Sequence, residues 1–388
     1  MHMNTATTSL MSCTEEHRWD EGLSNDAVVA VAMSGGVDSS VAALRLVSAG
    51  ITTIGITLAL WPKDREQVRD RGCCSLDAVE DARRVAALLG IPHYAWDLEE
   101  EFHAAVIDSF ASAYAAGKTP NPCITCNEQI KFGVLLEHAR SVGATHVATG
   151  HYARKVLMGN RYALHRGKDV AKDQSYTLYR LSQEQLDQAL FPVGDTVTKR
   201  ALREEALAHG LSTANKADSQ ELCFVNGTVR EDLRNRLAGR YHPGAIVHLD
   251  GRVVGEHEGI PFYTVGQRSR IPSSPVSPST EPLYVVAIEA STNTVTVGPR
   301  SALERQHLVL ESCSWIDPAS CTPQPRNIMV QLRAHGIPEE GELVRRDIEA
   351  GSAEVMTRTP VVQVAPGQSC VVYEGDRVLG GGIIQEAF

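Results

Sequence analysis

An unbroken apolar run, Ala27–Ala32, leads directly into the glycine-rich segment Met33–Ser40, which reads Met-Ser-Gly-Gly-Val-Asp-Ser-Ser. A short apolar run bounded by turn residues is typical of a strand buried on both faces. A helical pattern begins at Val41, so the glycine-rich segment joins the end of a strand to the start of a helix. A strand, a tight loop and a helix in this order restrict the first part of the chain to an α/β fold.

The glycine-rich segment has the features of a phosphate-binding loop. Ser34, Gly35 and Gly36 have small side chains, so backbone N–H groups can approach a polyphosphate. The helix that follows adds its N-terminal partial positive charge. The segment lacks the Gly-Lys-Ser/Thr ending of a Walker A loop, which argues against a motor protein or a GTPase. A plain glycine turn between a strand and a helix is the alternative interpretation.

The same segment resembles the pyrophosphate loop, Ser-Gly-Gly-Xaa-Asp-Ser, of enzymes that cleave ATP between its α and β phosphates to adenylate a substrate. Asp38 then either orients the loop or meets a Mg²⁺ ion on the phosphates. The resemblance implies that a continuous set of residues contacts ATP, namely Ala32, Met33, Ser34, Gly35, Gly36, Val37, Asp38 and Ser39.

Apolar strands alternate with amphipathic helices through the first half of the chain. The expected elements after the loop are 51–60, 77–89, 91–97, 99–115, 131–142 and 145–150. This alternation predicts a doubly wound parallel sheet with ligands at the carboxyl ends of its strands. Ser34 and His151 both follow such ends. A further helix is expected from about Thr198 to His209, followed by a mobile, functional loop over Leu211–Val225.

The pattern changes beyond Asn226. Residues 246–254 form two short runs around an Asp-Gly turn, which predicts a hairpin. Short strands are then expected at 283–289, 294–298, 327–334, 342–347 and 369–375, with the spacing of a small β-barrel. We therefore predict a disordered tail over 1–25, a nucleotide-binding catalytic domain over 26–225, a small mixed β domain over 226–295 and a C-terminal β-barrel domain over 296–388.

Composition limits the class of protein. Lys and Arg total 37 and Asp and Glu total 47, so the formal net charge is −10 and any nucleic-acid surface must be local. No apolar stretch approaches the roughly 18 residues of a membrane span, and residues 1–25 do not resemble a signal or transit peptide. The nine cysteines are an odd number and suit a reducing compartment. We expect a cytoplasmic protein that does not engage membranes.

The segment 119–133 contains a candidate nucleophile. Two Xaa-Pro steps hold its start extended, and Cys126 lies just before a helix expected to start near Asn127. A helix N-terminus stabilises a thiolate. The spacing Cys123-Xaa-Xaa-Cys126 alone leaves zinc, an iron–sulfur cluster and a dithiol open, although zinc would need two more ligands at similar spacing. The adjacent pair Cys73–Cys74 is interpreted as structural, because neighbouring side chains diverge.

Several segments, in order, resemble the motifs of the tRNA-specific 2-thiouridylases, the MnmA family. They are 119–132, 148–152, 172–176, 218–224, 263–268 and 365–368, so the resemblance extends from about Ala27 to the C-terminal barrel. It implies a tRNA uridine 2-sulfurtransferase, which uses ATP to replace the C2 oxygen of the wobble uridine, U34, with sulfur in certain tRNAs.

The resemblance also implies roles for particular residues. ATP adenylates the C2 oxygen, which is otherwise a poor leaving group, and AMP departs later; Leu58 and Gly150 would border the adenosine. A persulfide on Cys223 delivers sulfur directly, or releases it when Cys126 attacks and forms a Cys126–Cys223 disulfide that a reductant reopens. The sulfur would come from a partner protein, either a cysteine desulfurase or a persulfide relay protein.

Cys123 departs from part of the family pattern, because some members carry aspartate there. Cys123 either tunes Cys126, or joins Cys126 and Cys223 as a ligand of a [4Fe–4S] cluster with one iron open to sulfide. The second arrangement would be a different route of sulfur delivery.

Contacts with tRNA are also implied. The stretch Tyr152–Leu181 is locally rich in Lys and Arg, and the probable helix around Arg230–Arg240 adds further arginines, both suited to phosphates. The central domain, 226–295, would share in this contact. The target base must leave the anticodon stack to expose C2. The implied tRNA contacts are Asn121, Pro122 and Cys123 as walls of a base pocket, His151, Lys172, Asp173 and Gln174 beside it, and Gln368 from the barrel.

Two other classes of function compete with this one. An ATP-dependent adenylating amide ligase on the same nucleotide fold would use the loop at Met33–Ser40 but would need no cysteines, barrel or basic stretch. A non-catalytic module that binds nucleic acid or metal would leave that loop unexplained.

Overall fold

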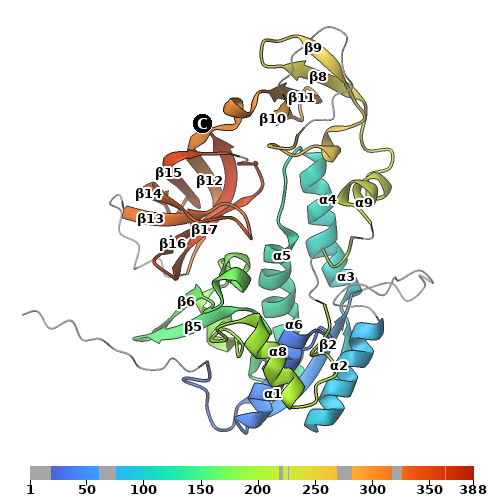
Figure 1. The fold of residues 1–388 in the computed structure, drawn as a ribbon, viewed down its shortest axis with the longest axis vertical. Coiled ribbons are helices and arrows are strands. Elements are labelled where there is room, and N and C mark those ends of the chain that lie inside the picture. The colour runs from blue at the N-terminus through green and yellow to red at the C-terminus, as the bar shows by residue number, and fades with distance from the viewer. Residues whose placement is uncertain are drawn as a thin grey trace, which may run out of the picture.

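The computed structural model describes residues 19–60, 76–217, 222–225, 227–268, 282–316, 326–362 and 364–388. Figure 1 shows an α/β domain at the bottom of the view, a β-barrel above it at the left and a small sheet at the top. The pair Cys73–Cys74, residues 1–18 of the expected tail and residues 218–221 of the expected loop lie outside the described ranges.

A five-stranded parallel sheet organises the α/β domain, as the alternating pattern predicts. Its order is β3-β2-β1-β4-β7, with β1 Val28–Ala32, β2 Thr52–Ala59, β3 His93–Asp97, β4 His146–Ala148 and β7 Ala189–Leu190. The chain leaves β1 toward β2 on one side and returns to β4 on the other. The carboxyl ends of β1 and β4 therefore meet at the switch point of the sheet, where such folds bind ligands.

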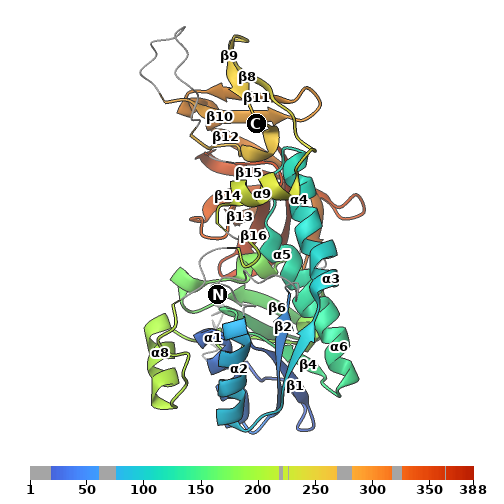
Figure 2. The same ribbon diagram turned by 90° about the vertical axis from the view of Figure 1, so that its right-hand side faces the viewer.

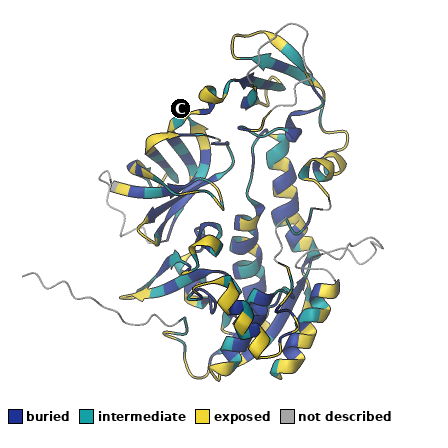
Figure 3. Ribbon diagram, viewed as in Figure 1, coloured by how far each residue is buried: buried dark blue, intermediate teal, exposed yellow. Residues whose placement is uncertain are grey.

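Helices cover both faces of this sheet (Figure 3). Val29 and Val31 of β1 pack in one core cluster with α1 and α8, whereas Ala30 packs in the other cluster, on the opposite face. This alternation follows from the two-residue period of a strand. The helices and short helical turns of this domain are α1 Val37–Ser48, α2 Leu76–Leu89, α7 Gln183–Gln188, α8 Lys199–Ala208, η3 Val170–Lys172 and η4 Ser175–Leu178.

Two long helices pack on the face opposite α1, and each contains a stretch of wide, π-type turns. The first comprises α3 Glu99–Phe102, η1 His103–Ile107 and α4 Asp108–Ala115. The second comprises α5 Pro122–Thr125, η2 Cys126–Val134 and α6 Leu135–Ser141. Figures 1 and 2 show α4 extending from the α/β domain to the small sheet.

The second long helix corrects the predicted start near Asn127, because it begins at Pro122. The Asn121 side chain accepts a hydrogen bond from the Cys123 backbone N–H, and proline occupies the first turn. An asparagine cap followed by proline is a strong start signal, since proline has no N–H to leave unsatisfied there.

A hairpin inside the basic stretch was not predicted. It comprises β5 Ala153–Met158 and β6 Arg161–Arg166. Strand β6 pairs with β17 of the barrel, where His165 lies opposite Arg377 and Leu164 opposite Val378. The α/β domain and the barrel therefore share one continuous hydrogen-bonded sheet.

The C-terminal strands form the predicted β-barrel. The sheet order β12-β15-β14-β13-β16-β17 closes through a direct pairing of β12 with β17. The strands are β12 Arg305–Trp315, β13 Arg326–Gln331, β14 Glu339–Asp347, β15 Ser352–Val361, β16 Ser369–Glu374 and β17 Arg377–Ala387, preceded by the turn η6 Arg300–Leu303.

A small sheet lies between these two parts in the sequence. Its order is β10-β11-β8-β9, and the predicted hairpin at the Asp-Gly turn is present as β8 and β9. Strand β11 runs to Gly298, past the boundary placed near 295. The elements are α9 Val229–Arg236, β8 Gly244–His248, β9 Val253–His257, η5 Ile260–Phe262, β10 Tyr284–Glu289 and β11 Thr294–Gly298.

The predicted disordered tail is wrong for its last residues. Trp19 and Leu23 pack against the core cluster formed around α1. Two apolar side chains in a short turn bury enough surface to hold this segment on the domain. Among the described residues, no helix has the length and apolar content that a membrane crossing requires.

Candidate functional site

The loop between β1 and α1 has a backbone that demands glycine. Gly35 has φ +66°, and a Cβ there would lie 2.3 Å from the carbonyl oxygen of Ala78 on α2. The Ser34 N–H donates to Ser39 Oγ at 3.1 Å, and Ser39 Oγ donates to the Gly36 carbonyl at 3.1 Å. These bonds hold the loop around the first turn of α1, which is the arrangement of a phosphate-binding loop.

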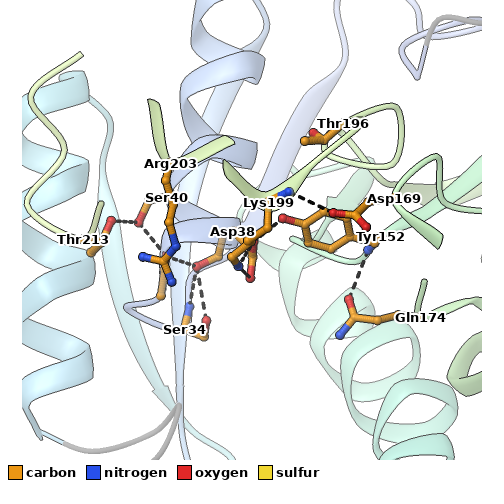
Figure 4. A network of polar contacts seen from close by, with 12 residues as sticks. Ser34, Asp38, Ser40, Tyr152, Asp169, Gln174, Thr196, Lys199, Arg203 and Thr213 are labelled. Carbon is orange, nitrogen blue, oxygen red and sulfur yellow. Dashed lines mark hydrogen bonds and ion pairs between the residues drawn. The ribbon is translucent and has the colours of Figure 1, made fainter. Parts of the chain in front are cut away.

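Two residues that the sequence did not single out hold Asp38 of this loop (Figure 4). Lys199 Nζ lies 2.5 Å from Asp38 Oδ1 and 2.6 Å from Oδ2. The Tyr152 hydroxyl donates to Oδ1 at 2.8 Å. The acidic side chain is thus fixed from the side of α8 and from the segment after β4.

Gly150, an expected neighbour of the adenosine, lies against the same turn. A Cβ at Gly150 would lie 2.7 Å from both the Asp38 carbonyl carbon and the Ser39 nitrogen. Leu58 and Met33 are buried, Leu58 in the cluster on one face of the sheet and Met33 in the cluster on the other. The predicted ATP residues therefore gather at the carboxyl ends of β1, β2 and β4.

Cys126 lies in the second turn of its helix, where the π-type stretch begins. Its backbone N–H bonds the carbonyls of Pro122 and Cys123, so the predicted stabilisation of a thiolate at a helix N-terminus does not describe this site. The side chain is buried in the core cluster that also holds Leu58. π-type turns inside helices occur frequently at functional sites.

Cys223 packs against the edge of that same cluster. The adjacent Phe224 is buried and makes edge-on contacts with Phe102 at 5.9 Å and Phe110 at 5.1 Å between ring centroids. Earlier in this segment, Thr213 Oγ1 donates to Ser40 Oγ at 2.9 Å. The segment that carries Cys223 therefore touches the phosphate loop at one end and the Cys126 cluster at the other.

Cys123 differs from Cys126 in its surroundings, because it is exposed whereas Cys126 is buried. The structure holds Cys123, Cys126 and Cys223 as thiols. Among the described residues, no three His, Cys, Asp or Glu side chains are grouped so that they could hold a metal ion. The three cysteines are therefore not arranged here as ligands of one iron–sulfur cluster.

His151 is buried rather than presented on the surface. Its Nδ1 is 2.7 Å from Thr149 Oγ1, and the rings of Phe132 and Phe191 flank it. Burial, with the charge of Lys131, lowers the pKa of His151 well below 6.5. The imidazole is neutral at pH 7, which suits contact with a base rather than with a phosphate.

The segment Lys172–Gln174 divides its side chains between surface and interior. Asp173 is buried and accepts hydrogen bonds from Arg166 at 2.7 Å, from Ser175 Oγ at 2.9 Å and from two backbone N–H groups. Lys172 is partly exposed and Gln174 is exposed. Gln174 Oε1 accepts from the Tyr152 N–H at 3.1 Å, which links this segment to the residue that holds Asp38.

Gln368, the tRNA contact expected from the barrel, lies at the start of the Cys126 helix. Gln368 Nε2 donates to the Thr119 carbonyl at 3.1 Å. A Cβ on Gly367, which has φ +92°, would lie 2.7 Å from the Thr119 nitrogen. A cavity of about 240 Å³ opens beside this contact, and its lining includes Asn121, Arg180 and Gly367.

The predicted basic surface is largely compensated by acids from other elements. Arg154 pairs with Asp376, Arg180 with Glu128 and Lys168 with Asp195. On α9, Arg230 and Arg234 both pair with Glu258, and Arg236 pairs with Asp232. A charge sum over a sequence window omits partners that the fold brings in, and this explains the difference.

Sequence reasoning missed Lys199, although the sequence held a signal. The helix start after Thr198 was predicted, and a lysine in the first turn of a helix is unfavourable against the helix dipole. A residue at odds with its local element is a reason to suspect a partner elsewhere. Tyr152 and Arg180 carried no comparable signal.

Comparisons with known proteins agree with this architecture. Three family models match: a tRNA methyl transferase HUP domain over residues 27–227, a tRNA methyl transferase PRC-barrel domain over 232–299 and an aminomethyltransferase beta-barrel domain over 305–384. The tRNA-specific 2-thiouridylase MnmA of Heliobacterium modesticaldum is 44% identical over 361 residues, which cover 92% of each chain. That of Moorella thermoacetica is 45% identical over 359 residues, covering 92% of this chain and 98% of its own. That of Ruegeria pomeroyi is 43% identical over 364 residues, covering 93% and 96%.

Proposed function

The chain belongs to the family of tRNA-specific 2-thiouridylases, MnmA, and on that basis we propose that it replaces the C2 oxygen of U34 in tRNA with sulfur, using ATP. It is a tRNA sulfurtransferase with a pyrophosphate-loop ATP site. The strongest support comes from the contacts of the segment that carries Cys223. Thr213 bonds Ser40 of the phosphate loop, and Cys223 itself packs against the core cluster that contains Cys126.

The first step activates the substrate. The C2 oxygen of U34 attacks the α-phosphorus of ATP, pyrophosphate leaves, and the carbonyl becomes an isourea-type adenylate. Backbone N–H groups around Ser34–Ser39 and the N-terminus of α1 bind the negative charge of the phosphates. Mg²⁺ would accompany ATP and neutralise part of the phosphate charge.

The second step delivers sulfur. A partner protein transfers sulfane sulfur to Cys223, giving a persulfide. In one route the terminal sulfur attacks C2 directly, and the Cys126 thiolate then attacks Cys223 Sγ, which breaks the S–S bond and leaves the sulfur on C2. In the other route the Cys126 thiolate attacks the inner sulfur of the persulfide first and releases hydrosulfide, which attacks C2; both routes form the Cys126–Cys223 disulfide. AMP leaves in both cases, and a dithiol reductant reopens the disulfide.

The thiol route is favoured over a [4Fe–4S] cluster. The described arrangement of Cys123, Cys126 and Cys223 does not fit a cluster, because one thiol is exposed, one buried, and no metal-holding group is present among the described residues. In the thiol route Cys123 is a neighbour that borders the substrate and accepts no sulfur.

We place the extruded base in the cavity beside Asn121 and take the other tRNA contacts from the family resemblance. Asn121 lines this cavity together with the Arg180–Glu128 ion pair, and Gln368 is fixed at its barrel side; Pro122 and Cys123 are not among the lining residues. A cavity of about 240 Å³ suits a single extruded base. His151 would meet the base, and Lys172 and Gln174 would contact the backbone of the anticodon loop.

The test uses purified protein, ATP, an unmodified tRNA transcript and a persulfide donor, with 2-thiouridine measured by mass spectrometry. Cys126→Ser and Cys223→Ser should each abolish 2-thiouridine while ATP binding is retained. The matched control is Cys313→Ser, because burial raises the pKa of Cys313 to about 12 and leaves that thiol inert. Normal 2-thiouridine from either active-site variant would contradict the two-thiol mechanism.

The same assay distinguishes a thiouridylase from an adenylating amide ligase. A thiouridylase should convert ATP to AMP and pyrophosphate only when tRNA is present, whereas an amide ligase would require an amino acid or another small carboxylate. Iron and labile-sulfide analysis of anaerobically purified protein tests the cluster. Stoichiometric iron that is required for activity would replace the thiol route.

A further inference from the structure

The Asp38–Lys199 ion pair at the phosphate loop has no role in the steps above. It joins residues 161 positions apart in sequence, with both carboxylate oxygens within 2.6 Å of the ammonium nitrogen. The Tyr152 hydroxyl donates to Oδ1 from a third part of the chain. The fold therefore assembles this contact from α1, α8 and the segment after β4 (Figure 4).

Lys199 is held so that it reaches Asp38. Its side chain is 13% exposed, and that of Asp38 is 34% exposed. The Lys199 backbone N–H donates to Asp169 Oδ2 at 2.8 Å, and the Thr198 side chain caps α8 by accepting from the Ala201 N–H. These contacts fix the first turn of α8, although a lysine there opposes the helix dipole. The stability of α8 does not account for this lysine.

Lys199 neutralises a carboxylate that lies unfavourably close to the phosphate loop. The loop attracts phosphates through backbone N–H groups and the N-terminus of α1, yet Asp38 places a carboxylate in the first turn of that helix. Near a protein surface, two like charges a few ångströms apart repel strongly. A carboxylate without its ammonium partner would therefore oppose the binding of ATP.

We propose that Lys199 is a positioning residue for the adenylation step, which fixes the Asp38 carboxylate at the edge of the loop and cancels its charge so that the loop accepts the phosphates of ATP. The proposal depends on the proposed function for the identity of the nucleotide. Tyr152 holds the same carboxylate from the other side, so its orientation is set by two contacts.

The test measures ATP affinity by titration calorimetry on the full chain, with Mg²⁺ present and without tRNA or a sulfur donor. Lys199→Met should weaken ATP binding at least tenfold, because Asp38 keeps its charge and loses its partner. The double variant Lys199→Met with Asp38→Asn should return to within about threefold of the unmodified protein, because both charges are gone. Unchanged affinity in the single variant, or a double variant as weak as the single one, would overturn the proposal.

The next residue on α8 provides a matched control. The Arg200 side chain is 88% exposed and pairs with Glu204, so Arg200→Met should bind ATP as the unmodified protein does. Lys199→Arg keeps the charge and should stay within threefold, whereas Lys199→Gln should be as weak as Lys199→Met. If Lys199→Met does not fold, the Arg and Gln variants decide, and equal affinities for the two would refute a charge-based role.

The experiment distinguishes a failure of the role proposed for Lys199 from a failure of the proposed thiolation reaction. ATP binding is measured without tRNA and without sulfur, so a protein that binds ATP in this pattern but forms no 2-thiouridine would contradict only the proposed reaction. Thiolation with ATP affinity insensitive to Lys199 would contradict only the role of Lys199.

Discussion

Lys172 and Asp173 are neighbours in the chain, but their physical situations differ. Lys172 is partly exposed at the end of η3, whereas the Asp173 carboxylate is buried and accepts four hydrogen bonds. The family resemblance implies that both contact tRNA. Their burial leaves the partly exposed lysine accessible to a substrate and places the aspartate in the interior of the protein.

Lys172→Ala should therefore weaken tRNA binding for all tRNA sequences and reduce its salt dependence, because a phosphate contact carries little sequence information. Thermal stability should not change. Fluorescence anisotropy over a range of salt concentrations measures the effect. An unchanged affinity at physiological salt would remove Lys172 from the interface.

Asp173→Ala should instead lower the free energy of unfolding by about 3–5 kcal/mol, because it leaves the Arg166 guanidinium without its buried carboxylate. Urea denaturation followed by circular dichroism checks this value. A variant with normal stability and a loss confined to tRNA affinity would contradict the interior role.

Lys155 gives a prediction about pH. Burial lowers the pKa of Lys155 from 10.5 to about 8, although the nearby charge of Asp187 partly opposes this shift. The unfolded chain therefore binds more protons between pH 8 and 10.5, and stability rises with pH across that range. Below pH 8 the folded protein bears the full loss of stability that comes from burying charged Lys155.

Lys155→Met should raise the free energy of unfolding at pH 7 by about 3 kcal/mol, at 1.36 kcal/mol per pKa unit, and should remove the gain in stability between pH 8 and 10.5. Denaturation midpoints at pH 7, 8, 9 and 10 provide the measurement. A variant less stable than the unmodified protein at pH 7 would show that the contact of Lys155 with the Tyr162 ring outweighs its desolvation.

The sequence predicts the helices and strands whose pattern is contained in a short stretch of residues. The strand at Val28–Ala32 and its glycine loop, the helix before Gly90 and the hairpin at Asp250–Gly251 follow from apolar period and turn residues. Strand β17 was missed because Gly380–Gly382 interrupts its apolar pattern. A Cβ on Gly381 would lie 2.3 Å from the Cys370 carbonyl, so the barrel needs glycine where a strand usually avoids it.

The candidate site likewise has some parts that the sequence predicts and others that it does not. The phosphate loop and the cysteines are visible as motifs, whereas the contacts of Asp38 with Tyr152 and Lys199 join three distant segments. The barrel closure and the pairing of β6 with β17 depend on long-range partners as well. Such contacts follow from topology, and no local window of sequence contains them.

The packing of Gly150, two residues after β4, on α1 supplies a prediction about these elements. Gly150→Ala should weaken ATP binding at least tenfold, because its Cβ would meet backbone atoms of Asp38 and Ser39 at 2.7 Å and displace the first turn of α1. Gly143→Ala is the control, since it has φ +83° and open space around it. The control should lose about 1 kcal/mol of stability and keep its ATP affinity. Equal ATP affinity in the two variants would contradict the packing argument.

In the whole molecule, buried hydrogen bonds and a ring contact join the barrel to the α/β domain. Arg166 of the hairpin bonds Asp173 and Gln331 and stacks on the Tyr373 ring at 3.6 Å. The Tyr176 hydroxyl donates to the Ser369 carbonyl at 2.8 Å. These buried contacts lie between the two parts, so we expect the parts to unfold together.

Scanning calorimetry of the full chain should therefore show the barrel and the α/β domain in one transition. Arg166→Met should split this transition in two and lower the midpoint of at least one part, because Asp173 becomes a buried carboxylate without its counter-charge. Arg300→Met, in the turn before the barrel, is a control that should leave the trace unchanged. A single transition at the original temperature in Arg166→Met would show that the two parts are coupled by other contacts.

The pairing of β6 with β17 also fixes a length. Backbone hydrogen bonds, rather than a flexible linker, set the spacing between the barrel surface at Gln368 and the α/β domain. A substrate that contacts both parts must therefore span a fixed distance between them. A barrel taken from another protein would restore activity only if it reproduced the register of Arg377 opposite His165.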